Sequence, residues 1–257
     1  MKREIEDLED YNMELITIMI VVFILGITIG SFLNVVIYRI PKGENIAFPA
    51  SHCQSCQTPL KWYHNIPIFS WIALGGKCSF CKEPISKQYP IVEFVTGLIA
   101  VVLFLKVGFV WYLPFLFASF AALFALVMID FKYYAVPDSV NFFALAMALV
   151  QPDYISGVIN AAIAALTLYL IGLGTSWIAK REAMGSADVI VAGTMAALLG
   201  FPNFFIALFL SAILAIAPSL AAKDTMVPFV PFLALATFIV YLFDTQATIL
   251  LNWIMYG

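Results

Sequence analysis

Charged residues are scarce in this sequence. Only 11% of its 257 residues are Asp, Glu, Lys or Arg, whereas 63% are hydrophobic and the mean hydropathy is +0.98. A water-soluble domain carries about 25% charged residues, so this composition excludes a soluble protein. Residues 15–38 contain no charge at all, and about 20 such residues are enough for a helix to cross a bilayer. The sequence therefore predicts an all-α polytopic membrane protein.

Two further features are missing. The sequence has no glycine-rich loop of the kind that cradles phosphate or adenosyl groups, which excludes a soluble Rossmann-type enzyme. Residues 1–14 are net acidic, whereas the first region of a cleavable signal peptide is basic. We therefore expect the first apolar stretch to be a membrane helix. The net charge of −3 gives no indication of nucleic-acid binding.

Apolar stretches along the chain predict about eight transmembrane helices. Two of them have only about 12 residues, or roughly 18 Å of helix against a ~30 Å hydrocarbon core, so they could be re-entrant instead. If both cross and the N-terminus lies outside, all 13 basic residues except Lys2, Arg3 and Lys106 face the cytoplasm, including Arg181 and Lys223. This agrees with the positive-inside rule and favours eight spans. The predicted helices are 15–38, 94–110, 114–130, 139–150, 154–179, 189–201, 203–222 and 227–243.

Residues 39–90 interrupt the apolar pattern. They hold all four cysteines, both histidines, six prolines and six of the 13 Lys and Arg residues. We expect a small polar cytoplasmic domain here, between an N-terminal segment with the first helix (1–38) and a membrane core (91–257).

The cysteines have the spacing of a metal site. Cys53-x2-Cys56 and Cys78-x2-Cys81 are two pairs of thiols in tight turns, which predicts a four-thiolate structural zinc site. The alternatives are two disulfides or free thiols, and a cytoplasmic location disfavours disulfides. His52 and His64 are alternative ligands, although four cysteines already complete a tetrahedral shell.

Two aspartates lie at the ends of predicted membrane helices. Asp130 ends the third helix and Asp188 begins the sixth, and the eight-span topology places both on the cytoplasmic side. Carboxylates in a membrane are costly and indicate a functional site. Two that meet can share one proton, so that one activates water while the other polarises a carbonyl. The alternative is that both are surface charges, with Asp188 as a helix N-cap; Asp138, after Pro137, is the better candidate for a plain N-cap.

Several motifs resemble the type IV prepilin peptidase (leader peptidase–N-methyltransferase) family, whose members are intramembrane aspartyl proteases of the Gly-x-Gly-Asp type. They follow one another in the family's order from residue 30 to residue 234. The matching segments are residues 30–41 (GSFLNVVIYRIP), 62–68 (WYHNIPI), 85–93 (ISKQYPIVE), 130–138 (the first aspartate motif, ending Pro-Asp), 185–188 (GSAD) and 227–234 (VPFVPFLA).

The resemblance implies a dual activity. It implies that the enzyme removes the basic leader of type IV prepilins or type II secretion pseudopilins after a glycine, with Asp130 and Asp188 as the catalytic pair. Relatives that carry the cysteine-bearing domain also methylate the new N-terminus with S-adenosylmethionine, whose binding residues the sequence does not locate. The expected partners are the pilin substrates and lipids of the bacterial inner membrane.

The sequence departs from the family pattern at three places. Ala187 replaces the second glycine of the Gly-x-Gly-Asp element, and Val230 stands where the last motif has glycine. The lysine that usually follows two residues after the second aspartate is absent, because Asp188 is followed by Val-Ile-Val. These changes affect the local geometry of the site more than the fold.

Two other functions remain open from the sequence. A transporter or channel could use intramembrane aspartates to relay protons or bind cations, and it would favour inverted repeats, of which we find none. A catalytically silent scaffold for pilus or secretion assembly is the other alternative. Cleavage of a prepilin-like peptide would separate both from the peptidase.

Overall fold

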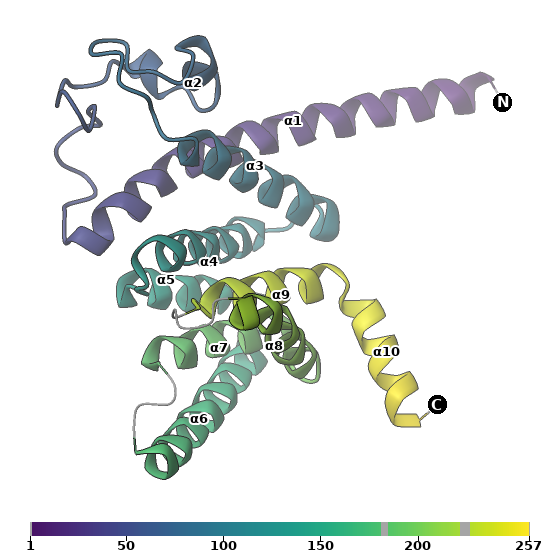
Figure 1. Cartoon of the computed structure of the whole chain (residues 1–257). Coiled ribbons are helices and arrows are strands. Elements are labelled where there is room, and N and C mark those ends of the chain that lie inside the picture. Colours follow the sequence, from purple (N-terminus) through teal and green to yellow (C-terminus); the bar gives the residue numbers. More distant parts are fainter. Residues whose placement is uncertain (1, 181–184, 222–226, 257) are drawn as a thin grey trace. The chain divides into compact units, whose positions relative to one another are not determined.

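The computed structural model describes residues 2–180, 185–221 and 227–256 (Figure 1). Arg181 and Lys223, which enter the charge argument above, lie outside the described residues. Within the described ranges the chain is helical, apart from loops and two isolated β-bridges. The helices are α1 (Lys2–Arg39), α2 (Phe69–Ala73), α3 (Gln88–Val107), α4 (Leu113–Tyr133), α5 (Asp138–Ala148), α6 (Tyr154–Ala179), α7 (Ser186–Leu199), α8 (Asn203–Ala221), α9 (Val230–Leu242) and α10 (Asp244–Tyr256), with short 3-10 helices η1 (Ile40–Lys42) and η2 (Trp62–Asn65).

Each of the eight segments predicted to be helical overlaps one of these helices, but the number of membrane spans is smaller. Five are long and apolar enough to cross a membrane: Asn12–Lys42, Gln88–Val107, Leu113–Tyr133, Tyr154–Ile178 and Asn203–Ala221. A sixth span results if α9 and the start of α10, bent by 90° at their junction, count as one. Length and composition thus support five or six spans in a multi-pass membrane protein, and the count of eight is not confirmed.

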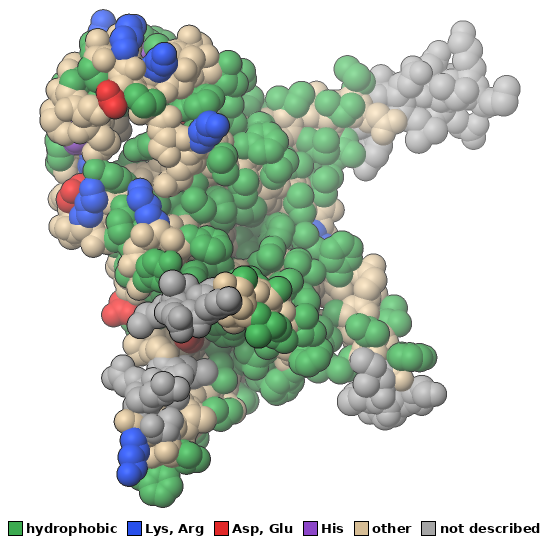
Figure 2. All heavy atoms as spheres, viewed as in Figure 1, with side chains coloured by type: hydrophobic (Ala, Val, Ile, Leu, Met, Phe, Trp, Pro, Cys, Tyr) green, Lys and Arg blue, Asp and Glu red, His purple; other side chains and the backbone are tan. Residues whose placement is uncertain are grey.

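Hydrophobic side chains cover much of the visible helical surface, as expected for contact with lipid (Figure 2). On α6 the exposed residues include Ile155, Ile159, Leu166, Leu170 and Trp177. Lys and Arg side chains gather instead over the segment between α1 and α3, which contains Lys61, Lys77 and Lys82 (Figure 2).

The chain forms two compact units, Met1–Val110 and Trp111–Gly257. In the first, α1 and α3 pack closely through glycines. A Cβ added to Gly26 would come within 2.8 Å of the Cα of Gly97, and one on Gly30 within 2.7 Å of the Cα of Glu93. Side chains at these positions would push the helices apart, so this small-x3-small spacing on α1 allows the two backbones to approach.

Motif residues of the first unit hold its polar segment in place. The buried guanidinium of Arg39 donates to three main-chain carbonyls, those of Asn45, Ile46 and Pro49, over 3.0, 3.4 and 2.7 Å. The buried carboxylate of Glu93 accepts a hydrogen bond from the N–H of Ile68 over 2.7 Å, at a residue with a φ of 62°. The segments that resemble the family's N-terminal motifs therefore anchor the loop region to α1 and α3.

In the second unit, α7 packs against α5, α6, α8 and α9. Seven consecutive α7 residues are buried, and most of them are small: Val191, Ala192, Gly193, Thr194, Met195, Ala196 and Ala197. Protein surrounds this stretch, so the length of α7, 14 residues, does not have to match a bilayer.

Candidate active site and metal centre

Asp130 lies in the last turn of α4 and is 6% exposed. The chain leaves the helix through Tyr134, which has a left-handed φ of 51° and donates its N–H to the carbonyl of Asp130 over 3.0 Å. A short extended stretch then leads into α5. The N-cap of α5 is Pro137, and Asp138, expected to be that cap, is the first helical residue. The extended backbone of Pro137 sets the boundary one residue earlier than predicted.

Asp188 lies in the first turn of α7. The N-cap is Gly185, not Asp188. The carboxylate of Asp188 accepts a hydrogen bond from the main-chain N–H of Gly185, and the N–H of Asp188 donates to the Gly185 carbonyl over 3.1 Å. Asp188 therefore helps to cap the helix. It does so as the third helical residue, in the manner of a capping box, and not as the N-cap residue that the surface-charge alternative assumed. Both of these bonds fix the direction of its side chain.

The two aspartates interact electrostatically although 58 residues separate them in sequence. Asp130 receives a hydrogen bond from the main-chain N–H of Val230, the first residue of α9. The start of a helix carries partial positive charge and unpaired N–H groups, which suit a carboxylate. Three helices thus contribute to one site: α4 and α7 supply the carboxylates, and α9 supplies a donor.

Two side-chain amides show why the end of α4 lies close to the beginning of α7. Asn141 Nδ2 of α5 donates to the carbonyl of Ala187 over 3.0 Å, and Gln151 Nε2, after α5, donates to the carbonyl of Ala197 over 2.9 Å. Each donor pairs with the residue 46 positions later, so α5 and α7 run parallel. The beginning of α5, which follows Asp130 by one short turn, therefore lies beside the beginning of α7, which carries Asp188.

This arrangement suits acid–base chemistry by two carboxyl groups. When two carboxylates lie close together, ionisation of one disfavours ionisation of the other, so the pair retains one proton. The ionised member can accept a proton from water while the protonated member donates a hydrogen bond to a carbonyl oxygen.

The departures at Ala187 and Val230 are compatible with this geometry. Both residues contribute main-chain atoms, the Ala187 carbonyl toward Asn141 and the Val230 N–H toward Asp130. The Val230 side chain is 1% exposed and packs inside the unit. The main-chain groups remain available whichever of these side chains is present.

The four cysteines meet in the first unit. Their sulfur atoms all lie within 4.8 Å of one another, and Sγ of Cys53 lies 3.8 Å from Sγ of Cys81. A tetrahedral zinc ion with Zn–S bonds of about 2.3 Å separates its sulfurs by about 3.8 Å, whereas a disulfide bond is about 2.05 Å long. All four thiols are free, so the donor set and spacing fit zinc. Neither His52 nor His64 belongs to the cluster found among the described residues.

The two cysteine pairs are copies of one local structure. Each pair is closed by a β-bridge, between His52 and Pro59 in one and between Lys77 and Pro84 in the other. In each, a left-handed residue follows the second cysteine, Gln57 (φ 57°) and Lys82 (φ 62°). In sequence the two copies share only the Cys-x2-Cys-x2-Pro positions.

Local hydrogen bonds favour the thiolate form of two of these cysteines, which is the form that binds a metal ion. The hydroxyl and the main-chain N–H of Thr58 lower the pKa of Cys56 to about 6. Main-chain hydrogen bonds from Cys81 and Phe80 lower the pKa of Cys78. A main-chain bond from Glu83 favours the Cys81 thiolate, but burial and the three neighbouring sulfurs outweigh it and raise the pKa of Cys81 to about 11. Four thiolates can share this space only around a positive ion.

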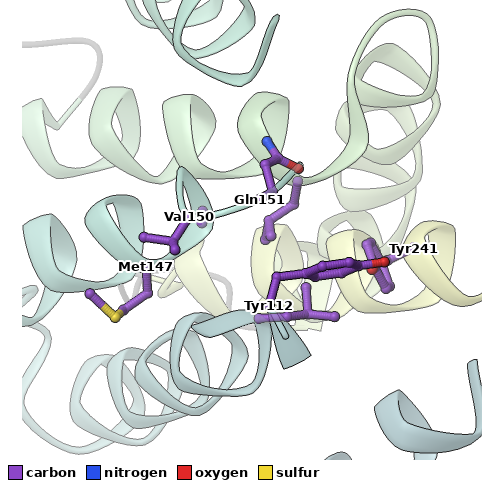
Figure 3. Close-up of a pocket in the computed structure, with 8 residues that line it drawn as sticks. Tyr112, Met147, Val150, Gln151 and Tyr241 are labelled. Carbon is purple, nitrogen blue, oxygen red and sulfur yellow. The ribbon is translucent and has the colours of Figure 1, made fainter. Parts of the chain in front are cut away.

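A small cavity lies at the other end of the second unit (Figure 3). It measures about 20 Å³, is lined by Tyr112, Met147, Gln151, Leu198 and Tyr241 among others, and has room for about one water. The Tyr112 side chain extends toward Tyr241 (Figure 3). Tyr112 precedes α4 whereas Asp130 is in its last turn, roughly 27 Å farther along the helix at 1.5 Å per residue. The cavity is thus separate from the aspartates.

Comparison with known protein families gives two matches. Residues 24–107 match the family described as bacterial peptidase A24 N-terminal domain, and residues 115–220 match the type IV leader peptidase family. The second match contains both Asp130 and Asp188, and the first contains all four cysteines.

Curated relatives cover most of the chain. A protein of Stutzerimonas stutzeri is 30% identical over an alignment of 261 positions, covering 88% of this chain and 90% of the relative, and one of Dichelobacter nodosus is 32% identical over 262, covering 86% and 90%. A protein of Myxococcus xanthus is 34% identical over 183, covering 69% of this chain and 55% of the relative. All three are named prepilin leader peptidase/N-methyltransferase. No solved structure shows significant similarity. The predicted resemblance is confirmed: this chain belongs to the type IV leader peptidase family.

Proposed function

We propose that this chain is a membrane-embedded aspartic endopeptidase that removes the leader of type IV prepilins or type II secretion pseudopilins after a glycine. The observation that carries the proposal is the pairing of Asp130 and Asp188 from separate helices, within a chain of the type IV leader peptidase family. Relatives named prepilin leader peptidase/N-methyltransferase over nearly their full length support the same substrate class.

In this proposal Asp130 and Asp188 hold one proton between them. The ionised carboxylate takes a proton from water, the resulting hydroxide attacks the scissile carbonyl, and the protonated carboxyl stabilises the developing oxyanion. The Val230 N–H keeps the Asp130 carboxylate in place through this exchange, and the Gly185 N–H does the same for Asp188. Breaking the peptide bond then requires only that a carboxyl group returns a proton to the leaving amine.

The cysteine cluster would hold one structural zinc ion through Cys53, Cys56, Cys78 and Cys81. Bound zinc supplies folding free energy to a polar segment that is too small for a good core of its own. We therefore propose residues 39–90 as a polar zinc domain. Residues 91–257 would form the membrane core, which carries both aspartates.

The proposal includes methylation of the new N-terminus, for which S-adenosylmethionine would supply an electrophilic methyl group. The cavity beside Tyr112 and Tyr241 has room for about one water, so it is too small for this cofactor.

We further propose that the protein lies in the bacterial inner membrane with the aspartates and the cysteine cluster facing the cytoplasm. The parallel arrangement of α5 and α7 supports a common side for Asp130 and Asp188. The distribution of Lys and Arg along the chain favours the cytoplasm as that side. For α5 and α7 to cross as full spans, surrounding helices or local thinning of the bilayer must compensate for their length.

Mass spectrometry of a processed peptide tests the proposed function. The purified protein in detergent is incubated with a synthetic prepilin-like peptide whose basic leader ends in glycine, with and without S-adenosylmethionine. We expect loss of the leader in both samples and a gain of one methyl group on the mature product only with the methyl donor. An intact peptide, from protein whose folding is verified by its melting transition, would instead support the silent scaffold. Ion flux in proteoliposomes without cleavage would support a transporter.

A further inference from the structure

One peptide unit of the proposed active site is held from both sides. The N–H of Asp188 donates to the carbonyl of Gly185 over 3.1 Å, and the carbonyl of Ala187 accepts from Asn141 Nδ2 over 3.0 Å. That carbonyl and that N–H belong to the same planar peptide group. Since the plane carries the Cα of Asp188 at one end, holding both of its polar atoms restricts where the Asp188 side chain can point.

Asn141 is well placed to act in this way. It is fully buried on α5, and α5 packs against both α4, which carries Asp130, and α7, which carries Asp188. On its own helix, Asn141 is held by a bond from its N–H to the carbonyl of Pro137 over 3.1 Å. Its Oδ1 is buried and has no hydrogen-bond partner among the described residues. A buried acceptor without a partner costs stability, so such a residue calls for a role other than stabilising the fold.

We propose that Asn141 is a positioning residue for the peptidase, which aligns Asp188 with Asp130 by holding the Ala187 carbonyl. This rests on the proposed function. Asn141 acts through Asp188 and is not itself the acid or the base. Its amide donates the one side-chain hydrogen bond that joins the first turn of α5 to the first turn of α7 among the bonds of the described residues.

Gln151 provides a matched comparison. Its amide makes the same type of bond, to the Ala197 carbonyl. This bond joins the residues that follow α5 to the last turns of α7, at the opposite end of both helices from Asn141. It borders the small cavity (Figure 3) rather than the aspartates. Loss of the Gln151 bond should affect packing to a similar degree while leaving Asp188 in place.

The shape of the pH–rate profile separates positioning from simple support of the fold. A smaller folded fraction lowers the rate equally at every pH, whereas a changed distance between the two carboxyl groups changes the apparent pKa values of the pair and shifts the profile. The titratable groups on these helices and on those packed against them are Asp130, Lys132 and Tyr133 on α4, Asp138 on α5, Tyr154 and Tyr169 on α6, Asp188 on α7 and Tyr241 on α9.

The experiment compares the full-length protein in detergent with Asn141→Leu and Gln151→Leu, measuring kcat/KM for a prepilin-like peptide against pH and the melting transition. Leu has nearly the shape of Asn and removes both the bond and the unpaired acceptor, so Asn141→Leu should fold. We expect it to lower kcat/KM by roughly 10- to 100-fold and to shift the profile, while Gln151→Leu keeps the wild-type profile. Asn141→Ser, too short to reach Ala187, should show the same shift if Asn141→Leu does not fold.

A wild-type profile in the folded Asn141 variants, or an equal shift in Gln151→Leu, would overturn the positioning role. Absence of cleavage by the wild-type protein would instead refute the proposed function, so the two failures can be told apart.

Discussion

Asp130→Asn and Asp188→Asn should each reduce leader cleavage by about 10³-fold or more while the protein remains folded. Asparagine keeps the size of the side chain but can neither accept a proton from water nor share one with its partner. Because the two carboxyl groups act as one unit, the double variant should be no slower than either single variant. The measurement is the initial rate of leader removal from a prepilin-like peptide, read by mass.

Asp153→Asn is the matched control for this chemistry. Asp153 caps α6 by accepting a hydrogen bond from the N–H of Ser156 over 3.3 Å, and asparagine caps helices about as well as aspartate. This variant undergoes the same loss of charge and should retain near-normal cleavage. Near-normal cleavage by Asp130→Asn or Asp188→Asn would refute the carboxylate pair.

Cys78→Ser should remove the metal and loosen the polar segment of the first unit. Cys78 is the most buried of the four cysteines, at 3% exposed, and its loss leaves three donors for an ion that requires four in a closed site. We expect bound zinc to fall from about one ion per chain to near zero. Elemental analysis measures the zinc. Hydrogen exchange at the two cysteine turns, residues 52–59 and 77–84, measures the loosening, since metal binding and folding are coupled in such segments.

His52→Ala and His64→Ala are the controls for the metal site. Both histidines lie near the cysteines in sequence but outside the cluster, so these variants should retain zinc. Equal loss of zinc in either one would place a histidine in the coordination shell. Wild-type protein with no zinc and four reactive thiols would refute the metal centre altogether.

The helices could be predicted from the sequence because long apolar runs have few other solutions in a membrane. The exact boundaries were less predictable, as at α5, where Pro137 rather than Asp138 is the N-cap. The number of spans was not predictable, because the short helix α7 is covered by other helices and its length need not match a bilayer. The spacing of Gly26 and Gly30 is a sequence signal that could have indicated the close packing of α1 on α3.

The candidate site could likewise be predicted only in part from the sequence. Asp130, Asp188 and the cysteines stand out because charge and metal-binding side chains are rare in this composition. The Val230 N–H could not be predicted, since every residue but proline has one and only the fold decides which points at Asp130. Asn141 offered a weak signal, as a polar residue in an otherwise apolar stretch, but its partner Ala187 is 46 positions away.

Cross-linking between positions 130 and 188 tests the central claim most directly, namely that the two aspartates share one site. Asp130→Cys and Asp188→Cys are combined in a background whose four native cysteines are replaced, and the membrane-inserted protein is treated with a short bis-methanethiosulfonate reagent. Asp153→Cys with Asp188→Cys serves as the reference pair, because Asp153 precedes α6 beside Gln151, at the end of α5 remote from Asp188. The structure predicts an intramolecular cross-link for the first pair and none for the reference. A cross-link that forms equally in both, or only in the reference pair, would contradict a shared active site.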